Sequence, residues 1–374
     1  MKVALVHDWL TGMRGGERVL EVFCRIFPDA PIFTLFYHPG SVSPLIESHP
    51  IIPSRLQKFP LSKKRYRLLL PLYPSAIESF DLRDFDIVLS TSHAVAKGAV
   101  ARKNSLSICY CHTPMRYIWD QYNSYFNTPS SSVLLRSIMP FFRDYLRYWD
   151  IDTQSRVDYY IANSRFVAQR ISRLYQRDCV VIPPPVDCSF YTPDHSNPGD
   201  FFLIVNALAP YKRVDLAIEA FNKNGLPLRI IGGGTESSSL RKMAGSNITF
   251  LGRVSDEDVR ENYRRCRALI FPGVEDFGLV PLEAQACGRP VIAFGHGGVL
   301  ETVIEGVSGH FFHQQTSEAL DTAIQEFESL QFSPDLISRR CREFDILEIE
   351  KRLRDYLNEI FSLTPSQLVE KNQI

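Results

Sequence analysis

The amino-acid sequence predicts an α/β fold with two doubly wound parallel sheets, one in each half of the chain. Short apolar runs alternate with helical or irregular stretches, a pattern typical of parallel strands covered by helices on both faces. A length of 374 residues favours two domains over one. The stretch Val181–Asp187 contains three consecutive prolines, which cannot continue a helix or a central strand. We therefore predict the domain boundary in this stretch, after residue 182.

Each half supplies its own series of strands, and a strong helix is predicted at Leu347–Phe361. The predicted organisation is an N-terminal domain at 1–182, a C-terminal domain at 183–344 and a C-terminal helical segment at 345–374, with the two domains facing a central cleft. Strands of the first half are expected at Val3–Trp9, Pro31–Phe36, Ile87–Ser92, Leu106–His112 and Tyr159–Asn163. Strands of the second half are expected at Phe202–Val205, Leu228–Ile231, Ile248–Leu251, Ala268–Phe271 and Val291–Phe294.

Composition and charge describe an ordinary globular protein and narrow the classes of partner. Hydrophobic residues make up 45% of the chain and charged residues 22%. Lysine plus arginine equals aspartate plus glutamate at 42 each, so we expect no nucleic-acid partner. The chain reaches Asp8 too early for a signal-peptide core, and no run approaches the ~18 apolar residues of a membrane span. A protein of the cytosol or of a membrane surface is expected.

Two patterns could indicate a metal, and neither favours one. The eight cysteines form no CxxC pair, which favours reduced thiols. Cys109, Cys111 and His112 could be ligands, but a buried strand that happens to contain cysteines is the better interpretation. Asp150–Asp152 imitates the DxD motif that binds metal-diphosphate in some transferases, yet it lies in a predicted helix.

The stretch Glu275–Glu283 places two carboxylates where a strand passes into a helix. The buried run at 268–272 precedes it, and the helix is predicted to start near Pro281 and to stop at Gly288. In open α/β sheets, ligands bind at the carboxyl ends of strands. The two glutamates, Glu275 and Glu283, are therefore candidate ligand-binding residues.

Two further candidates lie in the first half of the chain. The loop Thr11–Arg18 contains Gly15 and Gly16 between a strand and an amphipathic helix, and such a loop suits an anion at the helix N-terminus. A simple tight turn is an equally good interpretation of this loop alone. His112 ends its strand before Thr113-Pro114, which places its imidazole at the carboxyl edge of the sheet.

In the second half, Lys212 and Arg213 follow the strand Phe202–Val205. Two cations at a helix start are disfavoured by the helix dipole, so their presence indicates an anion such as diphosphate. The alternative is a pair of exposed bases. Gly232–Gly234 and Gly295–Gly298 are two more glycine loops at strand ends, consistent with a ligand crevice.

The segment Ser48–Ile77 is basic and apolar and contains no acidic residue. This composition suits an anionic membrane surface, whereas the simpler interpretation is a solvated helix with one core face. The apolar and basic stretch Val133–Trp149 either extends the same surface or forms a core helix. The predicted membrane-contact residues are Arg55, Lys58, Lys63, Lys64, Arg65 and Arg67.

Taken together, these motifs resemble the retaining glycosyltransferases of family four (group 1), which have the GT-B fold, over nearly the whole chain. The Glu-x7-Glu pair in its context is the most specific part of the match. Cys111–Asp120 and Pro210–Asp215 look like a subgroup of bacterial O-antigen mannosyltransferases that use GDP-mannose. The other motifs that match the family are Gly15-Gly16-Glu17, His112, Asn163-Ser164, Tyr211-Lys212-Arg213 and Gly232–Gly234.

The resemblance implies a role for each matching residue. Glu283 would accept hydrogen bonds from the ribose hydroxyls, and Glu275 would contact the transferred sugar, which His112 would also adjoin. Lys212 would neutralise the diphosphate, and Arg213 would supply a second charge, since many relatives carry an arginine where this chain has Ala207. The last helix would pack back on the N-terminal domain. The donor would also contact backbone or loop groups of Gly15, Gly16, Gly232, Phe277, Gly278 and Leu279.

The implied activity is transfer of a hexose, with mannose from GDP-mannose as first choice, to a saccharide or lipid-linked saccharide in the synthesis of a cell-surface polysaccharide such as O-antigen or exopolysaccharide. Retention, independence from metal and cofactor, and a peripheral position at the inner face of the cytoplasmic membrane are part of this expectation. The alternatives are a UDP-sugar donor, a nucleotide-sugar epimerase or hydrolase on the same fold, and a non-catalytic nucleotide-sugar-binding protein.

Overall fold

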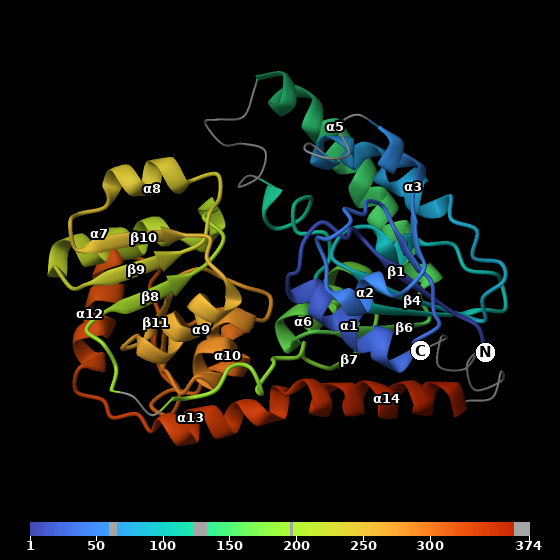
Figure 1. The fold of residues 1–374 in the computed structure, drawn as a ribbon. Helices are drawn as coiled ribbons and strands as arrows, with labels where there is room; N and C mark the ends of the chain where they lie inside the picture. Colours follow the sequence, from blue (N-terminus) through green and yellow to red (C-terminus); the bar gives the residue numbers. More distant parts are fainter. Residues whose placement is uncertain (60–65, 123–132, 195–196, 363–374) are drawn as a thin grey trace. The chain divides into compact units, whose positions relative to one another are not determined.

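The computed structural model describes residues 1–59, 66–122, 133–194 and 197–362, and the chain divides into two compact units (Figure 1). Unit 1 comprises Met1–Pro185 together with the chain from Ile349, and unit 2 comprises Val186–Glu348. The first division falls after the last of the three consecutive prolines, three residues beyond the predicted boundary. The second falls four residues beyond the predicted start of the C-terminal segment.

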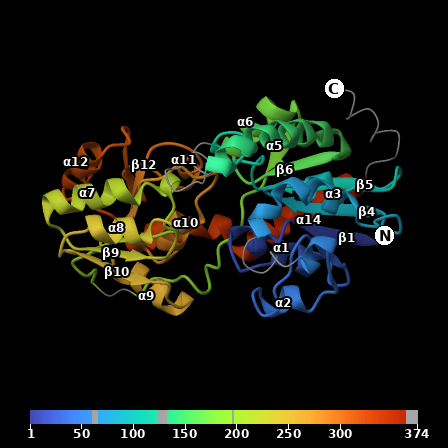
Figure 2. The same cartoon turned by 90° about the horizontal axis from the view of Figure 1, so that it is seen from above.

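Unit 1 is built on a sheet with the strand order β3-β2-β1-β4-β5-β6-β7 among the described residues, and neighbouring strands pair in parallel. The central pairing joins β1 to β4, from Val3 opposite Ile87 to His7 opposite Thr91. Figure 2 shows β1, β4, β5 and β6 side by side in this order. The strands are β1 (Val3–His7), β2 (Ile32–Thr34), β3 (Ile51–Pro53), β4 (Ile87–Ser92), β5 (Leu106–Cys111), β6 (Tyr159–Ala162) and β7 (Cys179–Val181).

Helices cover both faces of this sheet. Cys109 and Tyr110 are consecutive in β5, so their side chains point to opposite faces. Cys109 packs with Ile171 of the helix α6, and the Tyr110 ring lies 6.1 Å from the ring of Phe23 on α1. The helices are α1 (Gly15–Ile26), α2 (Pro44–Glu47), α3 (Tyr73–Glu78), α5 (Val133–Asp152), α6 (Arg165–Tyr175), α14 (Ile346–Ser362) and the 3₁₀ helices η1 (Arg55–Lys58), η2 (Tyr66–Leu72), η3 (Ala96–Gly98) and η4 (Thr153–Arg156).

The C-terminal helix α14 makes polar contacts with unit 1. The Arg354 guanidinium donates to the carbonyl of Arg25 at the end of α1, at 3.2 Å. Arg352 donates to the carbonyl of Val181 in β7 at 3.4 Å. One side of α14 is fully buried through Ile349, Leu353, Leu357 and Ile360. These contacts explain why the chain beyond Ile349 belongs to unit 1.

Unit 2 contains a second parallel sheet, with the order β10-β9-β8-β11-β12-β13 in the described chain. Two helices, α9 and α10, cover one face, and α7 and α12 cover the other. The strands are β8 (Phe202–Val205), β9 (Leu228–Ile231), β10 (Ile248–Gly252), β11 (Leu269–Phe271), β12 (Val291–Phe294) and β13 (Gly309–Phe312). The helices are α7 (Val214–Asn224), α8 (Ser237–Met243), α9 (Asp256–Arg265), α10 (Leu279–Ala286), α11 (Val299–Thr302), α12 (Ser317–Phe327), α13 (Pro334–Arg340), η5 (Pro210–Lys212) and η6 (Cys341–Phe344).

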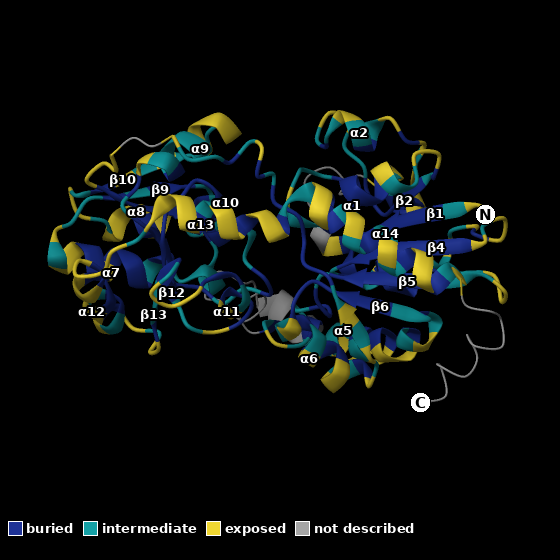
Figure 3. Ribbon diagram, turned by 90° about the horizontal axis from the view of Figure 1, so that it is seen from below, coloured by how far each residue is buried: buried dark blue, intermediate teal, exposed yellow. Residues whose placement is uncertain are grey.

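The predicted fold class of two doubly wound parallel sheets is confirmed, and all ten predicted strands are present to within a few residues. Three short strands were not predicted: β3, β7 and β13, each at an edge of its sheet. Each is only three or four residues long, too short a run to predict a strand, and each contains partly exposed residues (for β13, Figure 3). By contrast, all six residues of the central strand β4 are buried.

Candidate active site

Four loops come together at the carboxyl edge of the unit 2 sheet, after β8, β9, β11 and β12. Gly232 has a φ of +131°, and a Cβ there would lie 1.8 Å from the carbonyl oxygen of Asn206 in the loop after β8. Gly297 has a φ of +84°, and a Cβ there would lie 2.6 Å from the carbonyl oxygen of Glu275. Only glycine tolerates such an approach of two backbones. The predicted glycine loops therefore hold this edge together.

Lys212 and Glu275 form an ion pair between two of these loops. The Lys212 Nζ donates to Oε1 of Glu275, and their side chains are only 11% and 14% exposed. Lys212 ends η5, which follows β8, and Glu275 follows β11, the neighbouring strand in the sheet. From the sequence, we expect Lys212 to bind the diphosphate and Glu275 the transferred sugar. In the structure the two side chains bind each other. A ligand phosphate would compete with Glu275 for the ammonium group.

Two arginines lie near the same edge in different settings. Arg213 has a left-handed φ of +53°, and its guanidinium contacts the Asp215 carboxylate at 3.2 Å and Oε1 of Gln315 at 3.4 Å. Arg253, at the end of β10, is exposed, and its Nε lies 3.6 Å from where a Cβ of Gly233 would be. It is a cation beside the second glycine loop.

Glu283 lies in the second turn of α10 and is partly exposed. Its Oε2 accepts a hydrogen bond of 2.9 Å from the hydroxyl of Tyr263, a fully buried residue of α9. Sequence analysis missed Tyr263, because nothing in the sequence links two residues on separate helices. The turn before α10 contains Gly278 at a φ of +96°, and no side chain caps the helix there. Phe277 is 4% exposed and packs in the apolar cluster beneath this turn.

In unit 1, the predicted glycine loop and the predicted histidine do lie together. A Cβ on Gly16 would be 3.5 Å from Nε2 of His112 and 3.5 Å from Cε1 of His7. The buried His7 ring approaches Thr91 Oγ1 through Nδ1 at 2.6 Å and Glu17 Oε1 through Nε2 at 3.6 Å. The carboxyl edge of β1 and β5 and the start of α1 therefore form one polar cluster.

The titratable groups of this cluster influence one another. Burial and the charges of His93 and His7 lower the pKa of His112 well below its ordinary value. Burial tends to raise the pKa of Glu17, but its hydrogen bond to His7 and the charges of His7 and His93 outweigh burial and lower it. The cluster thus favours a neutral His112 beside an ionised Glu17 at neutral pH.

Asp8, at the end of β1, anchors the loop that carries His93. Its carboxylate accepts four backbone hydrogen bonds, from the amides of residues 93, 94, 95 and 96, at 2.7–2.9 Å. Sequence analysis used Asp8 only as evidence against a signal peptide. Its role depends on the parallel pairing of β1 with β4, which brings the two loops together.

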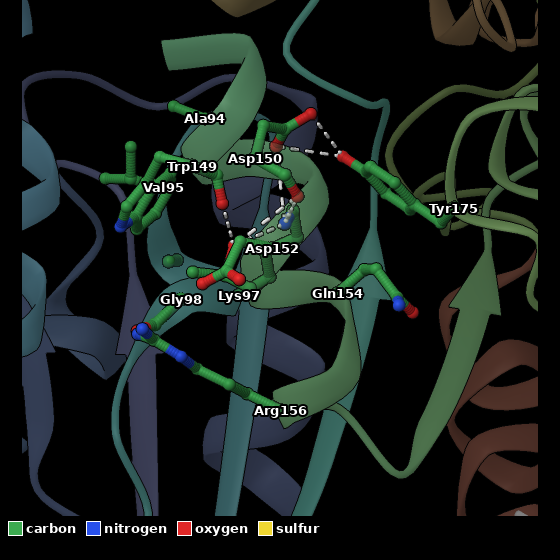
Figure 4. Close-up of polar contacts among 12 residues, drawn as sticks. Ala94, Val95, Lys97, Gly98, Trp149, Asp150, Asp152, Gln154, Arg156 and Tyr175 are labelled. Carbon is green, nitrogen blue, oxygen red and sulfur yellow. Dashed lines mark hydrogen bonds and ion pairs between the residues drawn. The ribbon is translucent and has the colours of Figure 1, made fainter. Parts of the chain in front are cut away.

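The DxD-like Asp150 belongs to a buried structural cluster (Figure 4). Its Oδ1 lies 3.3 Å from the Lys97 ammonium, with both side chains at most 1% exposed. The hydroxyl of Tyr175 donates to both carboxylate oxygens at 3.0 Å, and the Trp119 indole donates at 2.8 Å. Asp152, by contrast, is exposed. The two carboxylates of the motif are therefore in opposite environments, and Asp150 is occupied by protein donors.

The cysteines are consistent with the simpler interpretation made from the sequence. All eight lie within the described residues and are free thiols. Cys109 and Cys111 are buried in β5, and burial raises the pKa of Cys111 well above its ordinary value. Among the residues that the structure describes, no group of three or more histidine, cysteine, aspartate or glutamate side chains is arranged to hold a metal ion.

The predicted membrane-contact segment is only partly covered by the structure. Arg55 and Lys58 on η1 are exposed, as is Phe59, whereas Leu56 is buried. Lys63, Lys64 and Arg65 lie outside the described residues, and the side chain of Arg67 is not described. On α5, Phe141 and Tyr148 are 74% and 73% exposed, while Leu146 and Trp149 are in the core. No described helix is both long and apolar enough to cross a membrane.

The chain matches two protein families that together cover most of its length. Residues 13–190 match the family described as Glycosyltransferase Family 4, and residues 193–344 match Glycosyl transferases group 1.

Curated relatives match over shorter stretches. The chain is 30% identical over 187 residues to an uncharacterized glycosyltransferase, MJ1178, of Methanocaldococcus jannaschii, covering 48% of this chain and 52% of that protein. It is 34% identical over 137 residues to O-antigen chain mannosyltransferase C of Escherichia coli, covering 34% and 37%. A GDP-mannose-dependent alpha-(1-6)-phosphatidylinositol monomannoside mannosyltransferase of Mycolicibacterium smegmatis is 28% identical over 192 residues, covering 43% and 50%. The chain spans about half, or less, of the length of these relatives.

Solved structures share the fold of the whole chain. Anabaena Alr3699/HepE in complex with UDP and glucose has a TM-score of 0.71 at 17% identity, covering 97% of this chain and 100% of that one. Sucrose-phosphate synthase from Thermosynechococcus elongatus has a TM-score of 0.74 at 16% identity, with the same coverage. At these identities the likeness concerns the fold.

Proposed function

The chain belongs to the family 4, group 1 glycosyltransferases of GT-B fold, and from this premise we propose that it is a retaining enzyme that transfers a hexose from a nucleotide sugar. Mannose from GDP-mannose is the preferred donor, and the acceptor is a saccharide or lipid-linked saccharide of a cell-surface polysaccharide such as O-antigen or exopolysaccharide. The names of the E. coli and M. smegmatis relatives, both mannosyltransferases, support the choice of mannose.

The observation that carries the proposal is the Lys212–Glu275 pair at the carboxyl edge of the unit 2 sheet. Cleavage of a sugar–phosphate bond builds negative charge on the departing diphosphate and positive character on the sugar. Lys212 would meet the first charge, and Glu275 would then be released to contact the hydroxyls of the sugar. The preformed pair holds both groups in place before the donor binds.

The other residues have complementary roles in the proposal. Glu283 accepts the ribose hydroxyls, and the amides of the turn at Phe277, Gly278 and Leu279 hold the sugar, since no side chain caps α10 there. In unit 1, the amides of Gly15 and Gly16 contact the diphosphate, and His112 lies beside the donor sugar. Arg213 remains the proposed second cation, although it contacts Asp215, and donor binding would have to loosen this contact.

We propose that transfer needs no metal ion. The contacts of Asp150 support this proposal. Its carboxylate forms an ion pair with Lys97 and accepts hydrogen bonds from Tyr175 and Trp119, so the DxD-like motif is not free to bind a metal–diphosphate. The test is to measure transfer after treatment with EDTA, with and without added Mg²⁺ or Mn²⁺. Loss of activity with EDTA and its return with either ion would contradict the proposal.

The proposed reaction is tested with the donor alone and with an acceptor. We expect purified protein to release little GDP from GDP-mannose until a saccharide acceptor is added, whereas rapid formation of an epimer or of free sugar would favour the epimerase or hydrolase. Glu275→Ala should abolish transfer. Unchanged transfer by this variant would contradict the assigned site.

The identity of the nucleotide is tested separately. Thermal-shift measurements with GDP, UDP and ADP sugars compare binding to the folded protein, because a ligand that binds only the folded state raises its apparent stability. We expect the largest shift with GDP-mannose. A larger shift with a UDP-sugar would favour the second candidate donor, which is supported by the UDP and glucose in the Alr3699/HepE complex.

We also propose that the protein binds the inner face of the cytoplasmic membrane through its basic segment. The exposed Arg55, Lys58 and Phe59 support this, because cations and an exposed aromatic side chain suit an anionic lipid surface. Flotation with liposomes that contain anionic lipid tests the proposal. Binding should weaken in Arg55→Ser/Lys58→Ser, whereas Arg339→Ser/Arg340→Ser on α13 is the matched control of equal charge change. Equal flotation of both variants would contradict the proposal.

A further inference from the structure

The hydroxyl of Tyr263 is fixed against one oxygen of Glu283. Tyr263 is fully buried on α9, and its hydroxyl donates to Oε2 of Glu283 on α10 at 2.9 Å. The two residues come from different helices on the same face of the unit 2 sheet. The contact therefore joins the α9–α10 interface to a carboxylate that is partly exposed.

The ring that carries this hydroxyl is held tightly. Tyr263 belongs to the apolar cluster that also contains Cys266, Leu282 and Cys287. The Tyr191 ring packs against it edge-on, with centroids 5.9 Å apart. A ring surrounded in this way has one rotamer, so the position of its hydroxyl is set by the core.

In this contact Tyr263 is the hydrogen-bond donor and Glu283 is the acceptor. Burial, followed by the charge of Glu283, raises the pKa of Tyr263 well above its ordinary value. The phenol therefore remains protonated and donates, and a fixed donor favours the ionised form of the carboxylate. An ionised carboxylate has about four acceptor positions, so a bond from Tyr263 is compatible with bonds from a ligand.

We propose that Tyr263 is a positioning residue that holds the Glu283 carboxylate in the orientation needed to accept both hydroxyls of a ribose. This inference rests on the proposed function, in which Glu283 binds the ribose of the donor. A cis-diol presents two donors at a fixed spacing, and a glutamate side chain with several rotatable bonds would otherwise have to be ordered when the nucleotide binds. The bond from Tyr263 provides that order in advance.

The test compares nucleotides with and without the ribose hydroxyls. Binding of GDP and of 2′,3′-dideoxy-GDP is measured by calorimetry for the wild type and for Tyr263→Phe. In the wild type, removal of the hydroxyls should weaken binding about ten- to a hundredfold, as expected for hydrogen bonds to a charged group. In Tyr263→Phe this factor should fall to about threefold or less, and dideoxy-GDP should bind both proteins equally. If the enzyme prefers uridine, UDP and dideoxy-UDP replace this pair.

Kinetics supply a second measurement. Tyr263→Phe should raise the KM for the donor with little change in kcat, because ribose contacts are made equally in the ground and transition states. Tyr191→Phe is the matched control, since it removes a neighbouring hydroxyl from the same apolar cluster. It should keep the wild-type response to the ribose hydroxyls.

A purely structural role for Tyr263 predicts a different outcome. The variant would then lose stability but respond to the ribose hydroxyls by the same factor as the wild type, which would overturn the inference. If Tyr263→Phe folds poorly, 3-fluorotyrosine at position 263 preserves the ring and changes only the strength of its hydrogen bond. If that protein shows the same ratio of affinities for GDP and dideoxy-GDP as the wild type, the inference is also overturned.

Failure of this inference is distinguishable from failure of the proposed function. One outcome is that the wild type binds nucleoside diphosphates and loses affinity when the ribose hydroxyls are removed. If Tyr263→Phe then loses affinity by the same factor, only the role of Tyr263 is wrong. If the wild type binds neither GDP nor UDP, the proposed function and the inference are overturned together.

Discussion

Each unit contains a lysine–carboxylate pair, and the two pairs differ in what surrounds them. In unit 1, Lys97 and Asp150 are at most 1% exposed, and the lysine ammonium also donates to the Thr153 hydroxyl at 2.9 Å. In unit 2, Lys212 and Glu275 are 11% and 14% exposed and come from two loops at the carboxyl edge of the sheet. Similar chemical groups thus serve the core in one place and a candidate ligand site in the other.

The difference lies in the additional partners. Tyr175, Trp119 and Thr153 complete the hydrogen bonding of the buried pair, and the Lys97 ammonium lies 4.7 Å from the centre of the Tyr175 ring. Removal of either member would leave the other buried in the core without a partner of opposite charge. The pair at the sheet edge can exchange one partner for a ligand, because its groups lie near solvent. Exposure and the supply of fixed donors therefore separate the buried structural ion pair from the candidate functional one.

Removal of the buried lysine should give the largest loss of stability. Lys97→Ala leaves the Asp150 carboxyl group buried without its partner, and breaking such a buried pair costs about 3–5 kcal/mol. Urea unfolding should show a correspondingly lower midpoint. The control is Lys223→Ala, which removes a lysine from an exposed pair with Glu318 and should change stability by less than about 1 kcal/mol. Equal effects of the two substitutions would contradict the comparison.

Removal of the loop lysine should instead reduce activity. Lys212→Ala should lower kcat about 10²- to 10³-fold, because in the proposed reaction it removes a fixed charge that would meet the departing diphosphate. Its stability should change by no more than about 1–2 kcal/mol. Sugar transfer and urea unfolding are measured on the same preparation. A variant that retains full transfer, or one that loses as much stability as Lys97→Ala, would remove the distinction between the two pairs.

The smallest effect is expected at an exposed cluster, where His310 lies between two glutamates. Burial opposes protonation, but the hydrogen bonds that the imidazole donates from Nδ1 to Glu305 and from Nε2 to Glu326 outweigh it and raise the pKa of His310. Because the folded pKa is above the unfolded value of 6.5, the stabilisation is fully present below that value and is lost as pH rises through the folded pKa.

His310→Gln should therefore lower the melting temperature slightly at about pH 5 and leave it unchanged at about pH 9. The difference between the melting temperatures of the wild type and the variant is measured across this range. A difference that grows with rising pH would have the wrong sign and would contradict the assignment.

The sequence alone determined the two parallel sheets, the placing of Lys212 and Glu275 in loops that follow strands, and the placing of Glu283 in the helix after the second loop. Buried parallel strands form continuous apolar runs, and proline and glycine mark where helices begin and end, so these features are local in the chain. The edge strands β3, β7 and β13 escaped prediction because each is only three or four residues long.

Only the tertiary structure decided which residues became partners. Lys212 meets Glu275 because β8 and β11 are neighbours in the sheet, although 63 residues separate the two along the chain. Tyr263 meets Glu283 because α9 and α10 cover the same face. Asp150 meets Lys97 because the turn after β4 packs against the end of α5. Strand order and helix packing set these distances, and both depend on the whole fold rather than on any local pattern.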